Sequence, residues 1–427
     1  MARHGIITVF LRQLLVGAFP LVASAGPAPA AFTQELYVWQ RGAGPAVQAA
    51  LHEFAPQCDG FNVLAAEVSW RAGQPHLTRG EPDFAALAAL GRPVGLSLRI
   101  GAFGGPFAGD DANARALATL AAELLATARR HGLEPAELQV DFDCAEAKLP
   151  GYRAWLAALR EAVGPTPLVF TALPAWLDRR DDFAALAAAT DGFVLQVHSL
   201  ERPAGPDTPF TLCDPARARA WIRQATGIGR PFRVALPTYG YTLAFAPDGK
   251  FLGLGAEGPR PPWPGDALLR TVRADAVALA TLARELRVQP PEHCTGVLWF
   301  RLPVASDRLN WPAATLAAVL RGEAPRRALT LAVRWPESGL AEIVVRNTGE
   351  TSEPPPATLA LRWPTADRPS AADGLAGYRL APESNGRWRA VNNFPTRALL
   401  RPGSSVTVAW LRFAHEIPLQ AAVVEKP

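Results

Sequence analysis

The stretch Leu138-Gln139-Val140-Asp141-Phe142-Asp143-Cys144 lies in the first half of the 427-residue chain and decides its fold. Side chains alternate between the two faces of a strand, so Gln139, Asp141 and Asp143 share one face and the residues between them share the other. A buried carboxylate costs several kcal/mol unless it is paired. Two acids on one face of an apolar strand therefore indicate a functional site, and a structural ion pair is the alternative.

Seven further strand patterns flank this one, and Ala-rich amphipathic helical patterns separate them. The expected strands span residues 35–40, 60–68, 94–100, 138–144, 168–175, 193–198, 232–239 and 296–301. Eight strand–helix units in about 290 residues are typical of an α/β fold of the (β/α)8 TIM-barrel type. A doubly wound open sheet is the alternative, but no Gly-x-Gly-x-x-Gly pattern follows the first strand.

The composition changes after residue 322. Short segments between residues 329 and 413 are β-rich and are interrupted by Pro, Gly and Asn. They predict a small C-terminal all-β sandwich domain. We therefore expect a barrel over residues 33–322 and a β-sandwich over residues 328–427.

The first 25 residues have the pattern of a secretory signal peptide. Arg3 and Arg12 precede an apolar run at 14–22, and Ala23-Ser24-Ala25 fits the cleavage pattern. The run is too short to span a bilayer comfortably, and an uncleaved membrane anchor is the alternative. We expect an exported protein, periplasmic or secreted, with no stable membrane insertion after cleavage.

Charge and cysteine spacing argue against two classes of function. The formal net charge is +4 and no run of basic residues accompanies it, so we expect no nucleic-acid partner. The four cysteines are Cys58, Cys144, Cys213 and Cys294, and their spacing is not that of zinc ligands. They permit three different full sets of disulfide pairs. A metal held by Asp141 and Asp143 would lack evident further ligands, so we predict neither a metal nor a cofactor.

Polar and aromatic residues end the other expected strands, where TIM barrels hold their active sites. The residues at or just beyond these ends are Glu67, Arg99, Asp141, Asp143, Trp176, Gln196, His198, Tyr239, Trp299 and Arg301. Acids and amides bind hydroxyl groups, and aromatic rings stack on the apolar faces of sugars, so the set predicts a glycan ligand. We expect Asp141 and Asp143 to be catalytic and the others to bind substrate. Alternatively, the aromatic residues belong to the core and the two arginines neutralise the acids.

These strand ends resemble those of the chitinase-like family 18 glycoside hydrolases, which are TIM barrels. Three segments carry the resemblance: Val140-Asp141-Phe142-Asp143, Leu236-Pro237-Thr238-Tyr239-Gly240 and Gly296-Val297-Leu298-Trp299. The first is similar to the end of the family motif Asp-x-x-Asp-x-Asp-x-Glu. The resemblance implies that Asp143 takes the place of the general-acid Glu and that Asp141 takes the place of the Asp that orients the acetamido group. It also implies that Trp299 forms the floor of a sugar subsite.

Two departures from that pattern bear on catalysis. Asp143 is one methylene shorter than the Glu that it replaces, and a misplaced acid can cost about a hundredfold in rate. Gln196-Val197-His198-Ser199 stands where the family has Met-x-Tyr-Asp. The residues of the acetamido-assisted mechanism are therefore incomplete.

The whole chain is similar to an uncharacterised bacterial family, domain of unknown function 3142. The shared traits are Gln139-x-Asp141-Phe142-Asp143, Thr171-Ala172-Leu173-Pro174-Ala175-Trp176 and the β-rich C-terminal region. The resemblance implies a glycosidase-type barrel without an assigned reaction. We predict a glycoside-hydrolase-like enzyme that cleaves O-glycosyl bonds, with the pKa of its acid Asp143 raised by Asp141. The alternatives are a non-catalytic carbohydrate- or peptidoglycan-binding barrel of the cell envelope and a protein-interaction module.

Overall fold

A computed structural model of the chain describes residues 1, 31–107, 111–198, 202–259, 261–394 and 399–424. The chain divides into two compact units, Met1–Ala31 and Phe32–Pro427, and every element named below belongs to the second. The predicted signal peptide lies outside the described residues, apart from Met1. In the described part of the chain, no helix is both long and apolar enough to cross a membrane.

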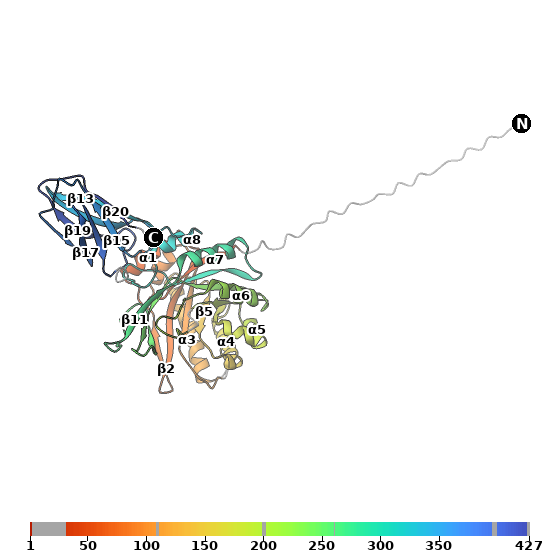
Figure 1. The fold of residues 1–427 in the computed structure, drawn as a ribbon. Helices are drawn as coiled ribbons and strands as arrows, with labels where there is room; N and C mark the ends of the chain where they lie inside the picture. The colour runs from red at the N-terminus through yellow and green to blue at the C-terminus, as the bar shows by residue number, and fades with distance from the viewer. Residues whose placement is uncertain (2–30, 108–110, 199–201, 260, 395–398, 425–427) are drawn as a thin grey trace. The chain divides into compact units, whose positions relative to one another are not determined.

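Eight parallel strands close into a barrel, which confirms the predicted TIM-barrel fold (Figure 1). In chain order they are β1 (Thr33–Val38), β2 (Gly60–Arg71), β4 (Val94–Ile100), β5 (Leu138–Phe142), β6 (Leu168–Ala172), β7 (Gly192–Gln196), β8 (Phe232–Pro237) and β12 (Cys294–Phe300). Every neighbouring pair is parallel. The barrel is closed because β1 pairs with both β2 and β12.

Helices connect the strands on the outside of the barrel. They are α1 (Pro45–Phe54), α2 (Phe84–Ala89), α3 (Ala112–Arg130), α4 (Leu149–Val163), α5 (Arg180–Ala188), α6 (Pro215–Thr226), α7 (Ala276–Val288) and α8 (Ala313–Leu320). Helices α3, α4 and α5 lie side by side (Figure 1). An Asp side chain accepts a backbone hydrogen bond at four helix starts, namely Asp83, Asp111, Asp214 and Asp275. This capping fixes where those helices begin.

Each barrel strand sends alternate side chains to the helices and to the barrel axis. In β5, Leu138, Val140 and Phe142 join the large apolar core between sheet and helices. Gln139 and Asp141 point to the interior of the barrel. The interior also holds a smaller apolar cluster made of Tyr37, Val169, Val194, Ala235 and Leu298. The alternation in β5 therefore places its two polar side chains on the barrel axis, as its sequence predicts.

Additional strands extend the barrel where β2 and β8 end. Strand β3 (Gln74–Arg79) pairs antiparallel with the end of β2. Strands β9 (Gly240–Phe245), β10 (Phe251–Gly255) and β11 (Leu268–Arg273) form a three-stranded antiparallel sheet after β8. Figure 1 shows the β2 hairpin and β11 at the same end of the barrel. That end carries the C-terminal ends of the strands.

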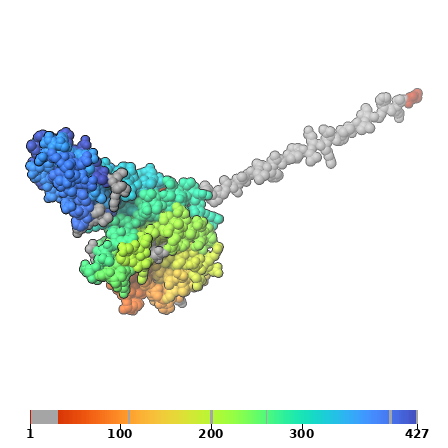
Figure 2. Space-filling model, viewed as in Figure 1, coloured from red at the N-terminus to blue at the C-terminus, as the bar shows by residue number. Residues whose placement is uncertain are grey.

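Two four-stranded antiparallel sheets follow the barrel, as the β-sandwich prediction requires. One contains β13 (Leu329–Glu337), β14 (Leu340–Asn347), β19 (Ser405–Arg412) and β16 (Ala371–Gly374). The other contains β17 (Tyr378–Ser384), β18 (Arg387–Asn392), β15 (Thr358–Arg362) and β20 (Gln420–Val423). Both sheets contribute to one apolar core, for example Ile343 from the first and Leu361 from the second. The two sheets belong to the part of the chain that is coloured blue in Figure 2.

The four cysteines are buried and unpaired, and all four lie among the described residues. Burial raises the pKa of the Cys58, Cys144 and Cys213 thiols to about 12. It raises the pKa of Cys294 to about 11. Thiols with such pKa values carry little thiolate at neutral pH, so these side chains act as small apolar core residues.

Candidate active site

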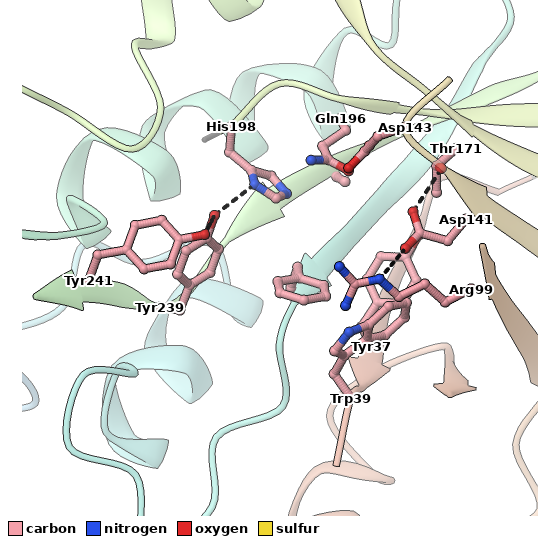
Figure 3. A pocket seen from close by; sticks show the side chains of 12 residues that line it. Tyr37, Trp39, Arg99, Asp141, Asp143, Thr171, Gln196, His198, Tyr239 and Tyr241 are labelled. Atoms are coloured by element: carbon pink, nitrogen blue, oxygen red, sulfur yellow. Dashed lines mark hydrogen bonds and ion pairs between the residues drawn. The ribbon is translucent and has the colours of Figure 1, made fainter. Parts of the chain in front are cut away.

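A cavity of about 210 Å³ opens at the C-terminal ends of the barrel strands (Figure 3). Its lining residues are Tyr37, Trp39, Arg99, Asp141, Asp143, Thr171, Gln196, His198, Ala235, Tyr239, Tyr241 and Phe300. Every barrel strand except β2 contributes a side chain to this lining, within the strand or just beyond its end. The cavity therefore lies on the barrel axis at the end where TIM barrels hold their active sites.

Asp141 and Asp143 both line the cavity because of the way β5 ends. The strand stops at Phe142, two residues earlier than the sequence pattern predicts. Asp141 is its last inward-facing residue, and Asp143 follows directly after the last strand residue. A strand end thus brings two carboxyl groups into one small cavity.

Asp141 is the more buried and the more strongly held of the two acids. Thr171 Oγ1 donates a hydrogen bond to Asp141 Oδ1 at 2.9 Å, and Arg99 Nε lies 3.8 Å from Asp141 Oδ2 (Figure 3). Burial and, next, the charge of Asp143 raise the pKa of Asp141 to about 6, against the opposing effects of Arg99 and Thr171. Near pH 6 this carboxyl group is therefore about half protonated.

Asp143 is exposed toward the cavity and its surroundings. Partial removal of its carboxyl group from water raises the pKa of Asp143, and the positive charge of Arg99 opposes that effect. The sequence-based prediction had Asp141 raising the pKa of Asp143. In the structure burial first, and the charge of Asp143 second, raise the pKa of Asp141, the more deeply buried of the two carboxyl groups.

Aromatic rings form the apolar part of the cavity lining. The ring centroids of Tyr37, Trp39 and Phe300 lie 5.1 to 5.6 Å apart in edge-to-face contacts. Tyr239 continues this cluster, with centroid distances of 5.6 Å to Phe300 and 5.0 Å to Tyr241. Edge-to-face packing fixes the orientation of each ring. Trp39 is only partly buried, so part of its indole is available to a ligand.

A buried polar network below the cavity holds the hydroxyl group of Tyr37. This hydroxyl donates to Gln139 Oε1 at 2.6 Å. Ser97 Oγ donates to Asn62 Oδ1 and lies 3.4 Å from the same Gln139 oxygen. Burial raises the pKa of Tyr37 well above its usual value, so the hydroxyl stays protonated and can donate. Among the described residues, Gln139 Nε2 has no hydrogen-bond partner.

His198 is a neutral group in this site. It is only 5% exposed, and its Nδ1 lies 3.0 Å from the Tyr239 hydroxyl oxygen. Burial lowers the pKa of His198 to about 3, because the charged imidazolium is poorly solvated there. At neutral pH His198 therefore serves as an uncharged hydrogen-bonding group beside Gln196 in the cavity lining.

Two of the predicted aromatic site residues do not line the cavity. Trp176 lies in the 3-10 helix η2 (Pro174–Arg179), is fully buried, and donates from Nε1 to the Cys144 carbonyl oxygen at 3.0 Å. Trp299 is also fully buried and packs in the core between sheet and helices. Because side chains alternate along β12, its inward-facing aromatic residue is Phe300 instead.

The predicted site residues Glu67 and Arg301 are engaged by charged partners outside the cavity lining. Arg41 donates to both carboxylate oxygens of Glu67, at 2.8 and 3.2 Å. Arg301 Nη2 lies 2.7 Å from Asp307 Oδ1, so this arginine neutralises Asp307 and not the Asp141–Asp143 pair. Thr238 holds the backbone of Arg301, since its Oγ1 donates to the Arg301 carbonyl and accepts from the Arg301 N–H.

Six lining residues are not among the predicted site residues: Tyr37, Trp39, Thr171, Ala235, Tyr241 and Phe300. For two of them the sequence carries a signal. Tyr37 and Trp39 alternate with Leu36 and Val38 in the first strand, which marks them as its inward face. Thr171 pairs with Asp141 across adjacent strands, and that partnership depends on the sheet register.

In the part of the chain that the structure describes, no three His, Cys, Asp or Glu side chains lie close enough together to hold a metal ion. The two carboxyl groups of the cavity are accompanied by Arg99, and a guanidinium beside them competes with any cation. The side chains that line the cavity supply groups for proton transfer, hydrogen bonding and aromatic contact.

Comparison with solved structures finds chitinases and other glycoside hydrolases. A chitinase from Chromobacterium violaceum is 16% identical, with a TM-score of 0.47, and the match covers 68% of this chain and 98% of that one. The spore cortex-lytic enzyme SleL from Bacillus cereus is 13% identical, with a TM-score of 0.46 and coverage of 70% and 75%. A chitinase from Rhizomucor miehei is 15% identical, with a TM-score of 0.42 and coverage of 68% and 99%.

Comparison with curated proteins found no match. Residues 91–305 match a family described as Domain of unknown function (DUF3142). The matched segment runs from just before β4 to just beyond β12, and it includes Asp141, Asp143 and most of the cavity lining. It covers half of the chain and agrees with the family resemblance seen in the sequence. The chain belongs to the DUF3142 family.

Proposed function

We propose that this protein is a glycan-acting enzyme of the glycoside-hydrolase type, and that Asp141 and Asp143 carry out its chemistry. One observation carries the proposal: two carboxyl groups and a cluster of aromatic rings line the same strand-end cavity. Sugars need both kinds of surface, because their hydroxyl groups require polar partners and their C–H faces pack on apolar ones. Cleavage of a glycosidic bond in most families uses a pair of carboxyl groups.

The two acids differ in environment, and this assigns them different roles. Asp143 is exposed to the cavity, so we assign it delivery of a proton to the glycosidic oxygen. As the bond between the anomeric carbon and this oxygen breaks, the leaving sugar departs as an alcohol. Asp141, whose pKa is raised to about 6, is the buried partner that carries negative charge once the proton of the pair has left. Its charge stabilises the oxocarbenium-like centre.

Water completes the reaction and restores the site. It adds to the anomeric carbon and gives one proton back to the Asp143 carboxylate, so one bond is hydrolysed and the enzyme is unchanged. Below about pH 6 the Asp141–Asp143 pair holds one proton, which rests mainly on Asp141 and must pass to Asp143 for the first step. The neutral His198 and the amide of Gln196 are placed to bind hydroxyl groups of the ring.

The volume of the cavity limits how many sugar rings of a glycan it can hold. Pockets for drug-sized ligands have volumes of about 300–1,000 Å³. This cavity, at about 210 Å³, is smaller and suits a single sugar ring. Trp39, Tyr241 and Phe300 would contact its apolar faces. The remainder of a glycan chain would extend outward along the strand ends.

The test compares turnover by the wild type and two variants. The full-length protein is incubated with a panel of β-glycans and aryl glycosides, and released sugar is measured. We expect Asp143→Asn to lower turnover about 10²–10⁴-fold, the usual contribution of general acid catalysis. Glu146→Gln is the matched control, because Glu146 is an exposed acid three residues away that does not line the cavity. It should keep wild-type turnover.

Equal turnover by the wild type and Asp143→Asn would remove Asp143 from the mechanism. Glycan binding without any product, unchanged in Asp143→Asn, would favour the second candidate, a non-catalytic carbohydrate-binding barrel. The shortened acid and the incomplete acetamido-assisting residues are the observations that support this alternative. Export to the periplasm or the medium stays part of the proposal, because it places the protein where envelope and extracellular glycans occur.

A further inference from the structure

Arg99 stands between two acids on the inner face of the barrel. The sheet register places it beside Glu67 on β2 and beside Asp141 on β5. Either carboxylate could neutralise the guanidinium group. In the described part of the chain, however, Arg99 makes no hydrogen bond to either one.

Each neighbouring acid is engaged elsewhere. Arg41 occupies both carboxylate oxygens of Glu67. Thr171 binds one oxygen of Asp141, and the other lies 3.8 Å from Arg99 Nε. Charge-assisted hydrogen bonds between nitrogen and oxygen measure about 2.7–2.9 Å, so this contact is a loose one.

The Arg99 side chain remains 45% exposed, and its guanidinium lines the cavity. Figure 3 shows its terminal nitrogens on the side away from Asp141, directed into the cavity. The donor groups of the Arg99 guanidinium are therefore available to a ligand in the cavity. Such a fork matches the two oxygens of a carboxylate.

We propose that the pocket takes an acidic sugar and that Arg99 binds the carboxylate of that sugar. This inference rests on the proposed glycan-acting function and names its substrate class. The shared chemistry is a pyranose ring that bears a carboxylate. The carboxylate belongs either to C6 of a uronic acid or to the lactyl ether of a muramic acid.

A bound carboxylate also fits the proton requirement of the site. The charged groups around Asp141 are Asp143, Glu67 and Arg99. A ligand carboxylate that occupies Arg99 adds negative charge beside Asp141 and withdraws part of its counter-charge. Both effects favour the protonated form of the Asp141–Asp143 pair, which is the form that the first catalytic step uses.

The test uses two pairs of ligands that differ only in the carboxylate-bearing group. The first pair is methyl β-glucuronide and methyl β-glucoside, and the second is N-acetylmuramic acid and N-acetylglucosamine. Affinities for the full-length protein are measured by ligand-detected NMR titration. The variants are Arg99→Gln and the control Arg79→Gln, which removes a comparably exposed arginine on β3 that pairs with Glu123 and does not line the cavity.

We expect the acidic member of at least one pair to bind the wild type about tenfold more tightly than its neutral partner. The preference should fall to within about twofold in Arg99→Gln and persist in Arg79→Gln. The pair that shows the preference identifies the source of the carboxylate.

Equal affinity for acidic and neutral members, or a preference that survives in Arg99→Gln, would overturn the acidic-sugar inference and leave the proposed glycan site standing. Failure of all four sugars to bind a protein with a normal thermal melt would contradict the proposed function itself. The two failures are therefore distinguishable.

Discussion

Among the described residues of the barrel interior, two arginine–carboxylate groups have opposite character: a lower group near the N-terminal ends of the strands and an upper group at the strand-end cavity. In the lower group Arg233 lies 2.7 Å from Glu35 and 2.6 Å from Glu137, and the three side chains are 12–16% exposed. In the upper group Arg99 lies 3.8 Å from Asp141 and remains 45% exposed. The same residue types therefore form a closed ion-pair cluster at one level and an open arrangement at the other.

The lower group is completed by its neighbours. Asn62 Nδ2 donates to Glu137 at 3.0 Å, and Thr33 donates to Glu35 at 3.0 Å. Gly95 leaves the room for this, because a Cβ there would lie 2.6 Å from Asn62 Nδ2. Burial works against the charge of Arg233, but the two carboxylates raise its pKa above the usual value. The fully paired charges of the lower group indicate a role in stability, whereas the loosely paired charges of the upper group indicate a role in ligand binding.

The largest expected effect comes from breaking the lower group. Arg233→Met leaves Glu35 and Glu137 buried without a counter-charge, and breaking a buried ion pair in this way costs about 3–5 kcal/mol. We expect a loss of that size in the free energy of unfolding at pH 7, measured by urea denaturation.

The control for this change is Arg219→Met. Arg219 pairs with Glu285 at 2.8 Å, but the pair lies on the surface, with side-chain exposures of 36% and 48%. Surface pairs contribute about 0–1 kcal/mol, so the control should be nearly neutral. Equal losses in Arg233→Met and Arg219→Met would show that the lower group is no more structural than a surface pair.

The second effect is a pH-dependent gain of stability in Asp141→Asn. The pKa of Asp141 is raised to about 6 in the folded protein, against about 3.9 in the unfolded chain. The folded state therefore binds the proton more tightly, and the wild type loses stability as the pH rises from about 4 to 6. Asparagine does not titrate, so the variant avoids this loss.

We expect the stability of Asp141→Asn relative to the wild type to increase by on the order of 2–3 kcal/mol between pH 4 and pH 7. The charged groups facing Asp141 are Asp143, Arg99 and Glu67, and they are unchanged in this comparison. Asp178→Asn, at an exposed acid outside the cavity, serves as the control. If the difference in free energy of unfolding between Asp141→Asn and the wild type were the same at every pH in this range, the pKa of Asp141 would not be raised in the folded protein.

The smallest effect is expected from Arg99→Met. Because the pairing with Asp141 is loose and partly exposed, its loss should change the free energy of unfolding by less than about 1 kcal/mol at pH 7. The pKa of Asp141 should rise further in this variant, since Arg99 lowers it in the wild type. Carboxyl ¹³C NMR titration measures that shift. A stability loss as large as that of Arg233→Met would erase the distinction between the two groups.

The sequence predicts the barrel and the position of the acids because both follow from alternation. A strand with polar residues at every second position must place them on one face, and eight such strands with helices between them close into a barrel. Asp141 and Asp143 consequently reach the cavity in the structure, as does Gln196 at the end of β7. These are local patterns that need no knowledge of the sheet register.

Arg99, His198 and Tyr239 also line the cavity, but four predicted residues do not, and their places depend on partners that a single sequence does not reveal: Glu67, Trp176, Trp299 and Arg301. Glu67 ends β2 as predicted, but Arg41 binds its carboxylate. At the end of β12 the sequence offers two adjacent aromatic residues, Trp299 and Phe300, and a shift of one position exchanges the inner and outer faces. The larger ring is the one in the core. Which residue faces the cavity therefore depends on where each strand ends and on how it pairs with its neighbours.

The most direct test of the central claim is a crystal structure of the Asp143→Asn variant with an oligosaccharide bound. Our account predicts one sugar ring in the strand-end cavity, in contact with Trp39 and Phe300, with a glycosidic oxygen about 2.6–3.2 Å from the side chain at position 143. A sugar bound elsewhere on the barrel, or a glycosidic oxygen beyond the reach of both position 143 and Asp141, would contradict it.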